Sequence, residues 1–147
     1  MTDGDAPANG NHDGKDPARI RSVAVHREDV ATALEATLRT DRRVVLRITP
    51  PFSGRMRARI HEAGAEDPTA AEGAIHVDPR DLVGDVPPYP EADETAARHP
   101  DADLATRRAR HGEAITDWRG AVREAVVDRV VLDPDDAAHE VRVAALG

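Results

Sequence analysis

A chain of 147 residues, 39% of them hydrophobic, is long enough to bury one core without a disulfide or a structural metal. It contains no cysteine, which excludes disulfide frameworks, thiolate nucleophiles and Cys-ligated metal sites. Its net charge is -8, and no apolar run approaches the roughly 20 residues that span a bilayer, so we expect a cytoplasmic protein that does not enter a membrane.

The first part of the chain is predicted to hold a tail, two strands and one helix. Residues 1–18 are rich in Asp, Gly, Asn and Pro and lack apolar periodicity, which is typical of a disordered acidic tail. Residues 19–25 and 43–49 have the β-branched content of strands. Between them, residues 28–39 carry apolar side chains at a spacing of four, which predicts an amphipathic helix.

A third strand is predicted at residues 55–61, where the sequence RMRARIH alternates strictly. Alternate side chains of a strand point to opposite faces. One face therefore takes the apolar side chains of Met56, Ala58 and Ile60. The other face takes the basic side chains of Arg55, Arg57, Arg59 and His61. A helix would scatter these four basic residues around its circumference, so the pattern favours a strand.

The next segment is predicted to begin with a short strand at residues 74–77. Asp78 and Pro79 then form the start of a short helix, as an N-cap and a first-turn proline. Residues 84–103 form a Pro-rich acidic insertion, longer than the connections usual in compact domains. We expect this insertion either to cover part of the protein or to move, with Tyr89 as a docking point.

The last part of the chain is predicted to hold the longest helix, at residues 104–127, with Trp118 as its anchor in the core. Gly112 and Gly120 weaken a helix, so we expect them to mark close packing against the sheet. Two strands follow, at residues 129–132 and 140–146.

The order of these elements predicts a single α+β domain over residues 19–147. We expect a two-layer sandwich, with a mixed or antiparallel sheet of four to six strands and the two main helices on one face. A ferredoxin-like split βαβ unit is the favoured variant. Because such a sheet leaves its other face in water, the basic side chains of residues 55–61 are expected to point to solvent.

Two stretches, TPPFSGRMRARIH and IHVDPRDLV, resemble sequences of small uncharacterised proteins from halophilic archaea. The composition fits such a source, because Asp and Glu number 28 and Lys15 is the sole lysine. The resemblance implies a salt-adapted, intracellular setting. It implies no activity, cofactor or catalytic residue.

Charge is unevenly divided along the chain. Residues 19–61 hold ten Arg and four acids, a net +6, whereas residues 62–103 hold two Arg and twelve acids, a net -10. In one interpretation the acidic segment, or another subunit, covers and neutralises the arginines of a structural or interaction protein. In the other, an open face binds RNA, a nucleotide or another phosphorylated ligand through Arg47, Arg55, Arg57, Arg59 and His61.

A third interpretation is a metal-dependent enzyme. His61, His76 and Asp78 lie at alternating strand positions and could supply two imidazoles and one carboxylate to a metal. No metal-binding helix motif supports them, and the sequence contains no phosphate loop, nucleophile elbow or dinucleotide fingerprint. We therefore expect a binding or interaction domain without a cofactor. Its partner would be a protein, a second copy of the chain, a nucleic acid or a phosphorylated ligand.

Overall fold

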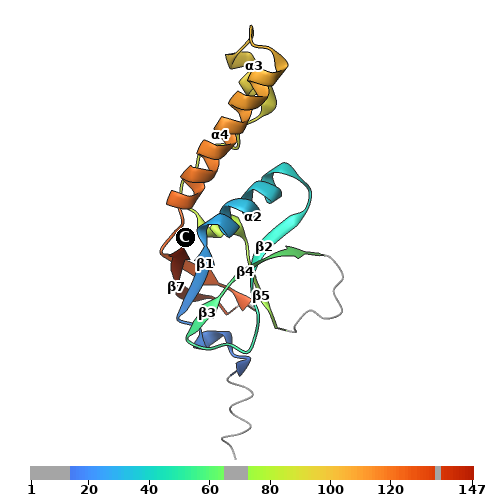
Figure 1. Cartoon of the computed structure of the whole chain (residues 1–147). Coiled ribbons are helices and arrows are strands. Elements are labelled where there is room, and N and C mark those ends of the chain that lie inside the picture. The colour runs from blue at the N-terminus through green and yellow to red at the C-terminus, as the bar shows by residue number, and fades with distance from the viewer. Residues whose placement is uncertain (1–13, 65–72, 135–136) are drawn as a thin grey trace, which may run out of the picture.

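The computed structural model describes residues 14–64, 73–134 and 137–147, and its architecture is α+β, as predicted (Figure 1). The strands are β1 Ser22–His26, β2 Arg43–Ile48, β3 Arg55–Arg57, β4 Arg59–Ala63, β5 Ile75–Val77, β6 Arg129–Leu132 and β7 His139–Leu146. The helices are α2 Arg27–Arg39, α3 Ala92–Arg98 and α4 Leu104–Glu124, with the 3-10 helices η1 Pro17–Arg19 and η2 Pro79–Leu82.

The strands form two sheets where we predicted one. The first has the order β3-β1-β7-β6, in which β1 is parallel to both β3 and β7 while β6 is antiparallel to β7. The second is antiparallel and has the order β4-β2-β5. This parallel pairing around β1 differs from the ferredoxin-like variant that we favoured, whereas the combination of mixed and antiparallel strands agrees with the predicted fold class.

The predicted strand 55–61 is divided at Ala58, and this division separates the two sheets. β3 pairs with β1, and β4 pairs with β2, so one regular strand could not serve both partners. Ala58 lies between them with 2% of its surface exposed, and its N–H donates to the carbonyl of Ala24 at 2.9 Å. Its small side chain lets the chain pass through the core from one sheet to the other. The predicted alternation holds in β3 and at Ala58, since Arg55, Arg57 and Arg59 are exposed and Ala58 is buried. It is wrong for Ile60, which the apolar pattern placed in the core and which is 39% exposed.

A single hydrophobic cluster joins the inner faces of both sheets to helix α2. Leu46 and Ile48 of β2 are fully buried in it, together with Val25 of β1. α2 contributes Val30 and neighbouring apolar residues from one side, which confirms its amphipathic pattern. Burial of these inner faces leaves the opposite faces of the sheets as outer surface, apart from Val45 of β2, which is paired with His61 on the outer side and is 1% exposed.

Helix α4 reaches this core only near its C-terminal end, where Trp118 and Val122 are buried. Its N-terminal part projects from the body and carries α3 beside it (Figure 1). We call this projection, residues 91–117, the arm. Burial of Trp118 confirms the prediction that it anchors the long helix in the core. The expected close packing at Gly112 and Gly120 is wrong, because among the described residues no atom outside the helix's own turns lies within 4 Å of a Cβ built at either position.

The predicted tail overlaps the described residues at its C-terminal end. Asp16 caps η1 by accepting a hydrogen bond from the N–H of Ala18 at 3.0 Å, and the N–H of Phe52 donates to the carbonyl of Gly14. The rest of the tail prediction, residues 1–13, lies outside the described residues. At η2, Asp78 and Pro79 take the capping and first-turn positions that the sequence predicted.

Candidate anion-binding face

The basic residues singled out in the sequence lie on the outer faces of both sheets. Strand pairing sets which side chains share a face, because directly paired residues point the same way. Arg55 and Arg57 belong to the first sheet, and Arg47, Arg59 and His61 to the second. Four further basic residues join them by strand register. We define the basic face as Arg43, Arg47, Arg55, Arg57, Arg59, Arg142, His26, His61 and His76.

Basic side chains are concentrated in the second sheet around β2. Arg47 is paired directly with Arg59 on β4 and with His76 on β5, so three basic residues form one row across the sheet. His61 lies in the next row, and its Nε2 is 3.4 Å from a guanidinium nitrogen of Arg47. The ring centroids of His61 and His76 are 5.4 Å apart. Basic groups from all three strands therefore converge on one place.

This convergence is electrostatically unfavourable in the free protein, because like charges placed directly opposite on a sheet destabilise it. The effect is visible at His76. Burial lowers the pKa of His76, and the neighbouring His61, Arg43 and Arg47 lower it further. The surroundings thus oppose a further positive charge, as a site that lacks a bound anion would.

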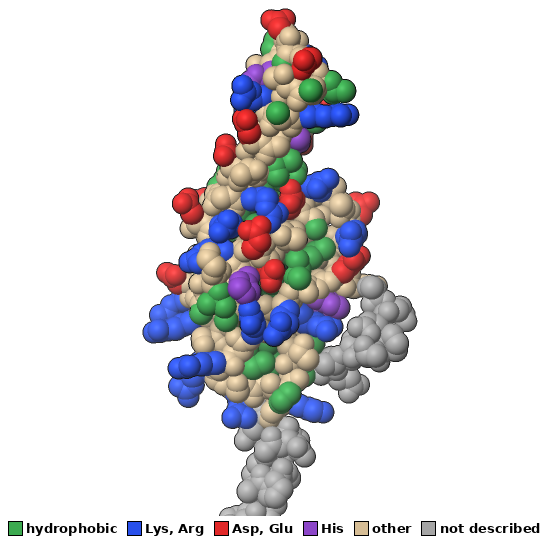
Figure 2. Space-filling model, viewed as in Figure 1, with side chains coloured by type: hydrophobic (Ala, Val, Ile, Leu, Met, Phe, Trp, Pro, Cys, Tyr) green, Lys and Arg blue, Asp and Glu red, His purple; other side chains and the backbone are tan. Residues whose placement is uncertain are grey.

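The basic face continues over the first sheet with a different arrangement. Ser22 at the centre of the sheet is flanked by Arg55 on β3 and by Arg142 on β7. In the next row the small residue Ala24 is paired with Arg57. Arginines therefore border the small side chains of Ser22 and Ala24, which are both partly exposed. Figure 2 shows Lys and Arg side chains forming a band across this side of the molecule.

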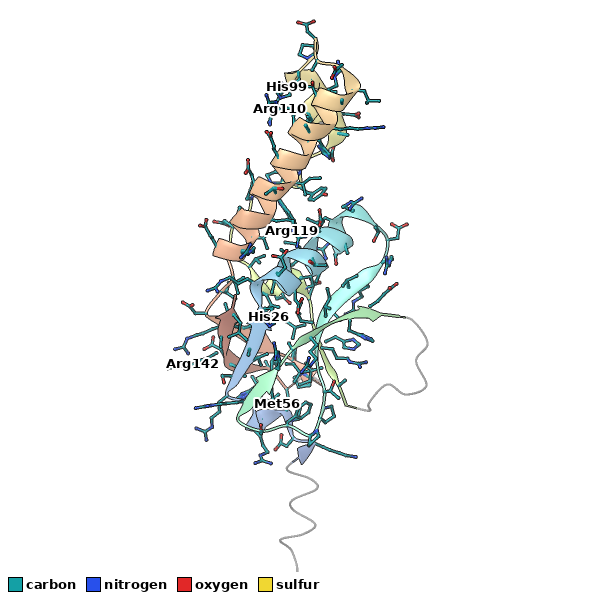
Figure 3. All side chains as sticks on the ribbon, viewed as in Figure 1. His26, Met56, His99, Arg110, Arg119 and Arg142 are labelled. Carbon is teal, nitrogen blue, oxygen red and sulfur yellow. The ribbon has the colours of Figure 1, made fainter. Side chains whose placement is uncertain are left out.

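His26 ends β1 at the border of this region, and Figure 3 shows it with Arg142 on the same side of the molecule. A guanidinium nitrogen of Arg57 lies within hydrogen-bond distance of His26 Nε2. Because arginine is only a donor, His26 Nε2 is the acceptor in this hydrogen bond. Neither His26 nor Arg142 was singled out in the sequence, since their place on this face depends on the pairing of β1 with β7.

Carboxylates do not neutralise the basic face within the part of the chain that the structure describes. Ion pairs there involve other arginines, namely Arg42, Arg80, Arg110, Arg119, Arg123 and Arg129. Glu62 lies on the neighbouring strand β4, but it is paired with Arg42. In one interpretation the acidic segment covers the arginines of the basic face. Residues 73–103 of that segment form no ion pair with this face, and residues 65–72 lie outside the described residues.

The acidic Pro-rich insertion packs instead on α2 and α4. The indole N–H of Trp118 donates to the carbonyl of Pro87 at 2.9 Å, and Tyr89 stacks edge-on against Trp118 with ring centroids 4.9 Å apart. The hydroxyl of Tyr89 donates to Glu35 on α2 at 2.8 Å. Tyr89 therefore docks the insertion, as the sequence predicted. These contacts direct the insertion to the helices rather than to the basic face.

Helices α2 and α4 are joined by Arg119, one of the arginines that have carboxylate partners. Arg119 donates to Glu35 at 2.7 Å, to Thr32 at 2.8 Å and also to Glu28. The hydrogen bond from Arg119 holds the pKa of Glu28 below its ordinary value. We call Arg119, Glu28, Glu35 and Tyr89 the helix network.

The proposed metal ligands do not converge. His61 and His76 are close, but the carboxylate of Asp78 accepts from the N–H of Arg80 at 2.9 Å and lies 3.5 Å from the Arg80 guanidinium. Asp78 is held as the cap of η2, which turns it from the two imidazoles. Over the described ranges, no three His, Asp or Glu side chains are grouped as metal ligands would be. The hypothesis of a metal-dependent enzyme required His61, His76 and Asp78 to converge on one metal, and in the described residues they do not.

None of the helices in the described ranges has the length and apolarity needed to cross a bilayer. A family model described as "Domain of unknown function (DUF8009)" matches residues 10–147. No curated protein and no solved structure matches the chain.

Proposed function

The chain belongs to this DUF8009 family of unknown function, and from the geometry of its basic face we propose that it binds nucleic acid through the phosphate backbone. One observation carries most of the weight. In a protein of net charge -8, the six arginines of the basic face have no carboxylate partner among the described residues, whereas Arg129, which is paired with Arg142 in register, is bonded to Glu140. Because no described carboxylate pairs with these six arginines, their guanidinium groups can contact an anion.

A nucleic acid fits this face better than a protein partner does. The centres of protein–protein interfaces are depleted in charge and rich in apolar and aromatic residues, whereas interfaces with nucleic acid are polar and strongly positive. The centre of the first sheet carries Ser22 between Arg55 and Arg142, and Ala24 between Arg57 and Ala144. Small side chains at this position suit the close approach of a sugar–phosphate backbone.

Phosphates, rather than bases, are the groups that the described basic face can hold. Recognition of unpaired bases uses aromatic side chains as stacking platforms, and the outer positions of the described strands carry no Phe, Tyr or Trp. Contacts to phosphates fix orientation and carry no sequence information. We therefore expect binding with little sequence preference.

We also propose that this binding takes place in the cytoplasm of a salt-adapted, halophilic cell. A single lysine, Lys15, among 20 basic residues and an excess of acids support this setting. At about 1 M salt the Debye length is about 3 Å, so long-range attraction contributes little. Direct bidentate contacts from arginine retain their strength at such short range. This would explain why the basic face is built from arginine.

The test measures fluorescence anisotropy of a labelled single-stranded RNA of about 12 nucleotides, a length within the site sizes of single-strand binders. Titrations run from about 0.1 M to 1 M KCl. The double variant Arg57→Ala, Arg59→Ala should bind at least about tenfold more weakly, with a plot of log Kd against log salt that is shallower by about one to two. Circular dichroism checks that the variant is folded.

A matched control removes the same charge from the arm. Arg108 and Arg110 are exposed on α4 (Arg110 is labelled in Figure 3), so Arg108→Ala with Arg110→Ala should leave RNA affinity unchanged. Equal losses in both double variants would mean that net charge alone governs binding, which would overturn the assignment to the basic face. Equally effective competition by poly-glutamate would indicate an acidic protein partner and would overturn nucleic acid as the ligand.

A further inference from the structure

Resting on the proposed function, we propose that Arg47, His61 and His76 form a subsite for a phosphate monoester at one end of the bound nucleic acid. The subsite lies on the second sheet, where β4, β2 and β5 each supply one of these residues. Arg59 and Arg43 lie beside it on the same face. The remainder of the strand would then pass over Arg57 and Arg55 on the first sheet.

The side chains of the subsite lie close together on the sheet face. The imidazoles of His61 and His76 are 5.4 Å apart between ring centroids, and Arg47 reaches His61 Nε2 at 3.4 Å. If Nε2 accepts from Arg47, the Nδ1 of His61 carries a proton that can be donated elsewhere. The other N–H groups of Arg47 also stay available, since no described carboxylate pairs with it.

Charge distinguishes a monoester from the diesters inside a nucleic acid chain. Each diester carries a single negative charge and suits a lone arginine such as Arg55 or Arg57 on the first sheet. A phosphate monoester carries about -1.5 to -2 at pH 7 and has three acceptor oxygens. The row Arg59, Arg47, His76 with His61 beside it offers several donors to one group. The excess positive charge therefore matches the more highly charged end group.

Binding at this subsite would be coupled to protonation of His76. The charged groups near the two histidines are Arg43 and Arg47 on β2 and Arg59 on β4, while Asp78 next to β5 is engaged by Arg80. Asp81 and Asp133 line a pocket together with His76. A bound dianion offsets the burial and the positive neighbours that lower the pKa of His76 in the free protein. Proton uptake should accompany binding, and affinity should rise as the pH falls from about 8 toward 6.

Three RNA probes of one sequence test the subsite: one with a 5′-phosphate, one with a 3′-phosphate and one with hydroxyls at both ends. At about pH 6.5 we expect one phosphorylated probe to bind at least about tenfold more tightly than the hydroxyl probe. Which end is preferred gives the polarity of the bound strand. Calorimetry in buffers of different ionisation enthalpy should show proton uptake for the preferred probe and less for the hydroxyl probe.

The variant His61→Gln, His76→Gln should remove the preference, so that phosphorylated and hydroxyl probes bind alike. His99→Gln, on the arm, is the control and should keep the preference (Figure 3). Should the double variant fail to fold, the single variant His76→Gln, at an exposed position, should weaken the preference.

Different results would overturn the monoester subsite and the proposed binding of nucleic acid. Binding of all three probes with equal affinity to the native protein would overturn the subsite and leave the proposed function standing. Absence of RNA binding, together with inorganic phosphate shifting the His61 and His76 proton resonances in NMR spectra, would support the subsite and overturn nucleic acid as the ligand. Absence of both would overturn both.

Discussion

Arg119 in the helix network and Arg47 on the basic face are both partly buried, but their neighbours are of opposite charge. Arg119 is held by the carboxylates of Glu28 and Glu35. Arg47 faces Arg59 and His76 in its own row and has no carboxylate partner among the described residues. The same side chain thus stabilises the fold in one place and destabilises it in the other. We infer that a ligand supplies the missing negative charge at Arg47.

The largest effect is expected from Arg119→Gln, which keeps much of the side-chain length and removes the charge. Glu35, with 16% of its side chain exposed, would lose an ionic partner and keep the neutral hydroxyl of Tyr89. The free energy of unfolding should fall by about 2 kcal/mol, as when one member of a partly buried pair is removed. Chemical denaturation monitored by circular dichroism measures it.

Arg110→Gln provides the control for this loss. Arg110 pairs with Glu113 on the exposed surface of α4, where both side chains are more than half exposed. Its removal should change the free energy of unfolding by no more than about 0.5 kcal/mol. A comparable loss in both variants would show that the helix network has no special role in stability.

A second effect concerns Tyr89, the chain's only tyrosine, so its ultraviolet titration can be assigned directly. Burial, followed by the hydrogen bond to Glu35 and the charge of Glu35, raises the pKa of Tyr89 from 10.0 to about 12. Because the folded-state pKa is raised, Tyr89 contributes stability that is fully present below pH 10 and is lost as the pH rises through about 12.

Two measurements check this pH dependence. Tyrosinate absorbance of the native protein should appear near pH 12, and that of the denatured protein near pH 10. The unfolding midpoint in denaturant should decrease between these two values. Titration of native Tyr89 at the same pH as in the unfolded chain would contradict its docking against Glu35.

The smallest effect, and the one of opposite sign, is expected from Arg47→Gln. Removing a positive charge from the row Arg59, Arg47, His76 relieves repulsion across β2. The free energy of unfolding should rise by about 0.5 kcal/mol at low salt and return toward the native value as salt screens the repulsion. A loss of stability like that of Arg119→Gln would mean that Arg47 has a neutralising partner, and would remove the contrast between the two surfaces.

The fold class, most of the helices and strands, and the exposure of Arg55, Arg57 and Arg59 could be predicted from the sequence. The alternation in residues 55–61 is local, because side chains of a strand alternate with a period of two, so Arg55, Arg57 and Arg59 point outward whatever pairs with the strand. The amphipathic pattern of α2 and the Asp78 cap of η2 are equally local. Each depends on residues within one or two turns of the chain.

The partners of those side chains were decided by tertiary structure. The break at Ala58 and the addition of His26 and Arg142 to the basic face follow from long-range strand pairing, which no local pattern encodes. The acidic insertion is similarly directed by Tyr89 and Trp118 toward the helices. Charge counting identified a basic block followed by an acidic one. Within the acidic block, the insertion at residues 84–103 packs on α2 and α4, because its aromatic anchor Tyr89 docks there.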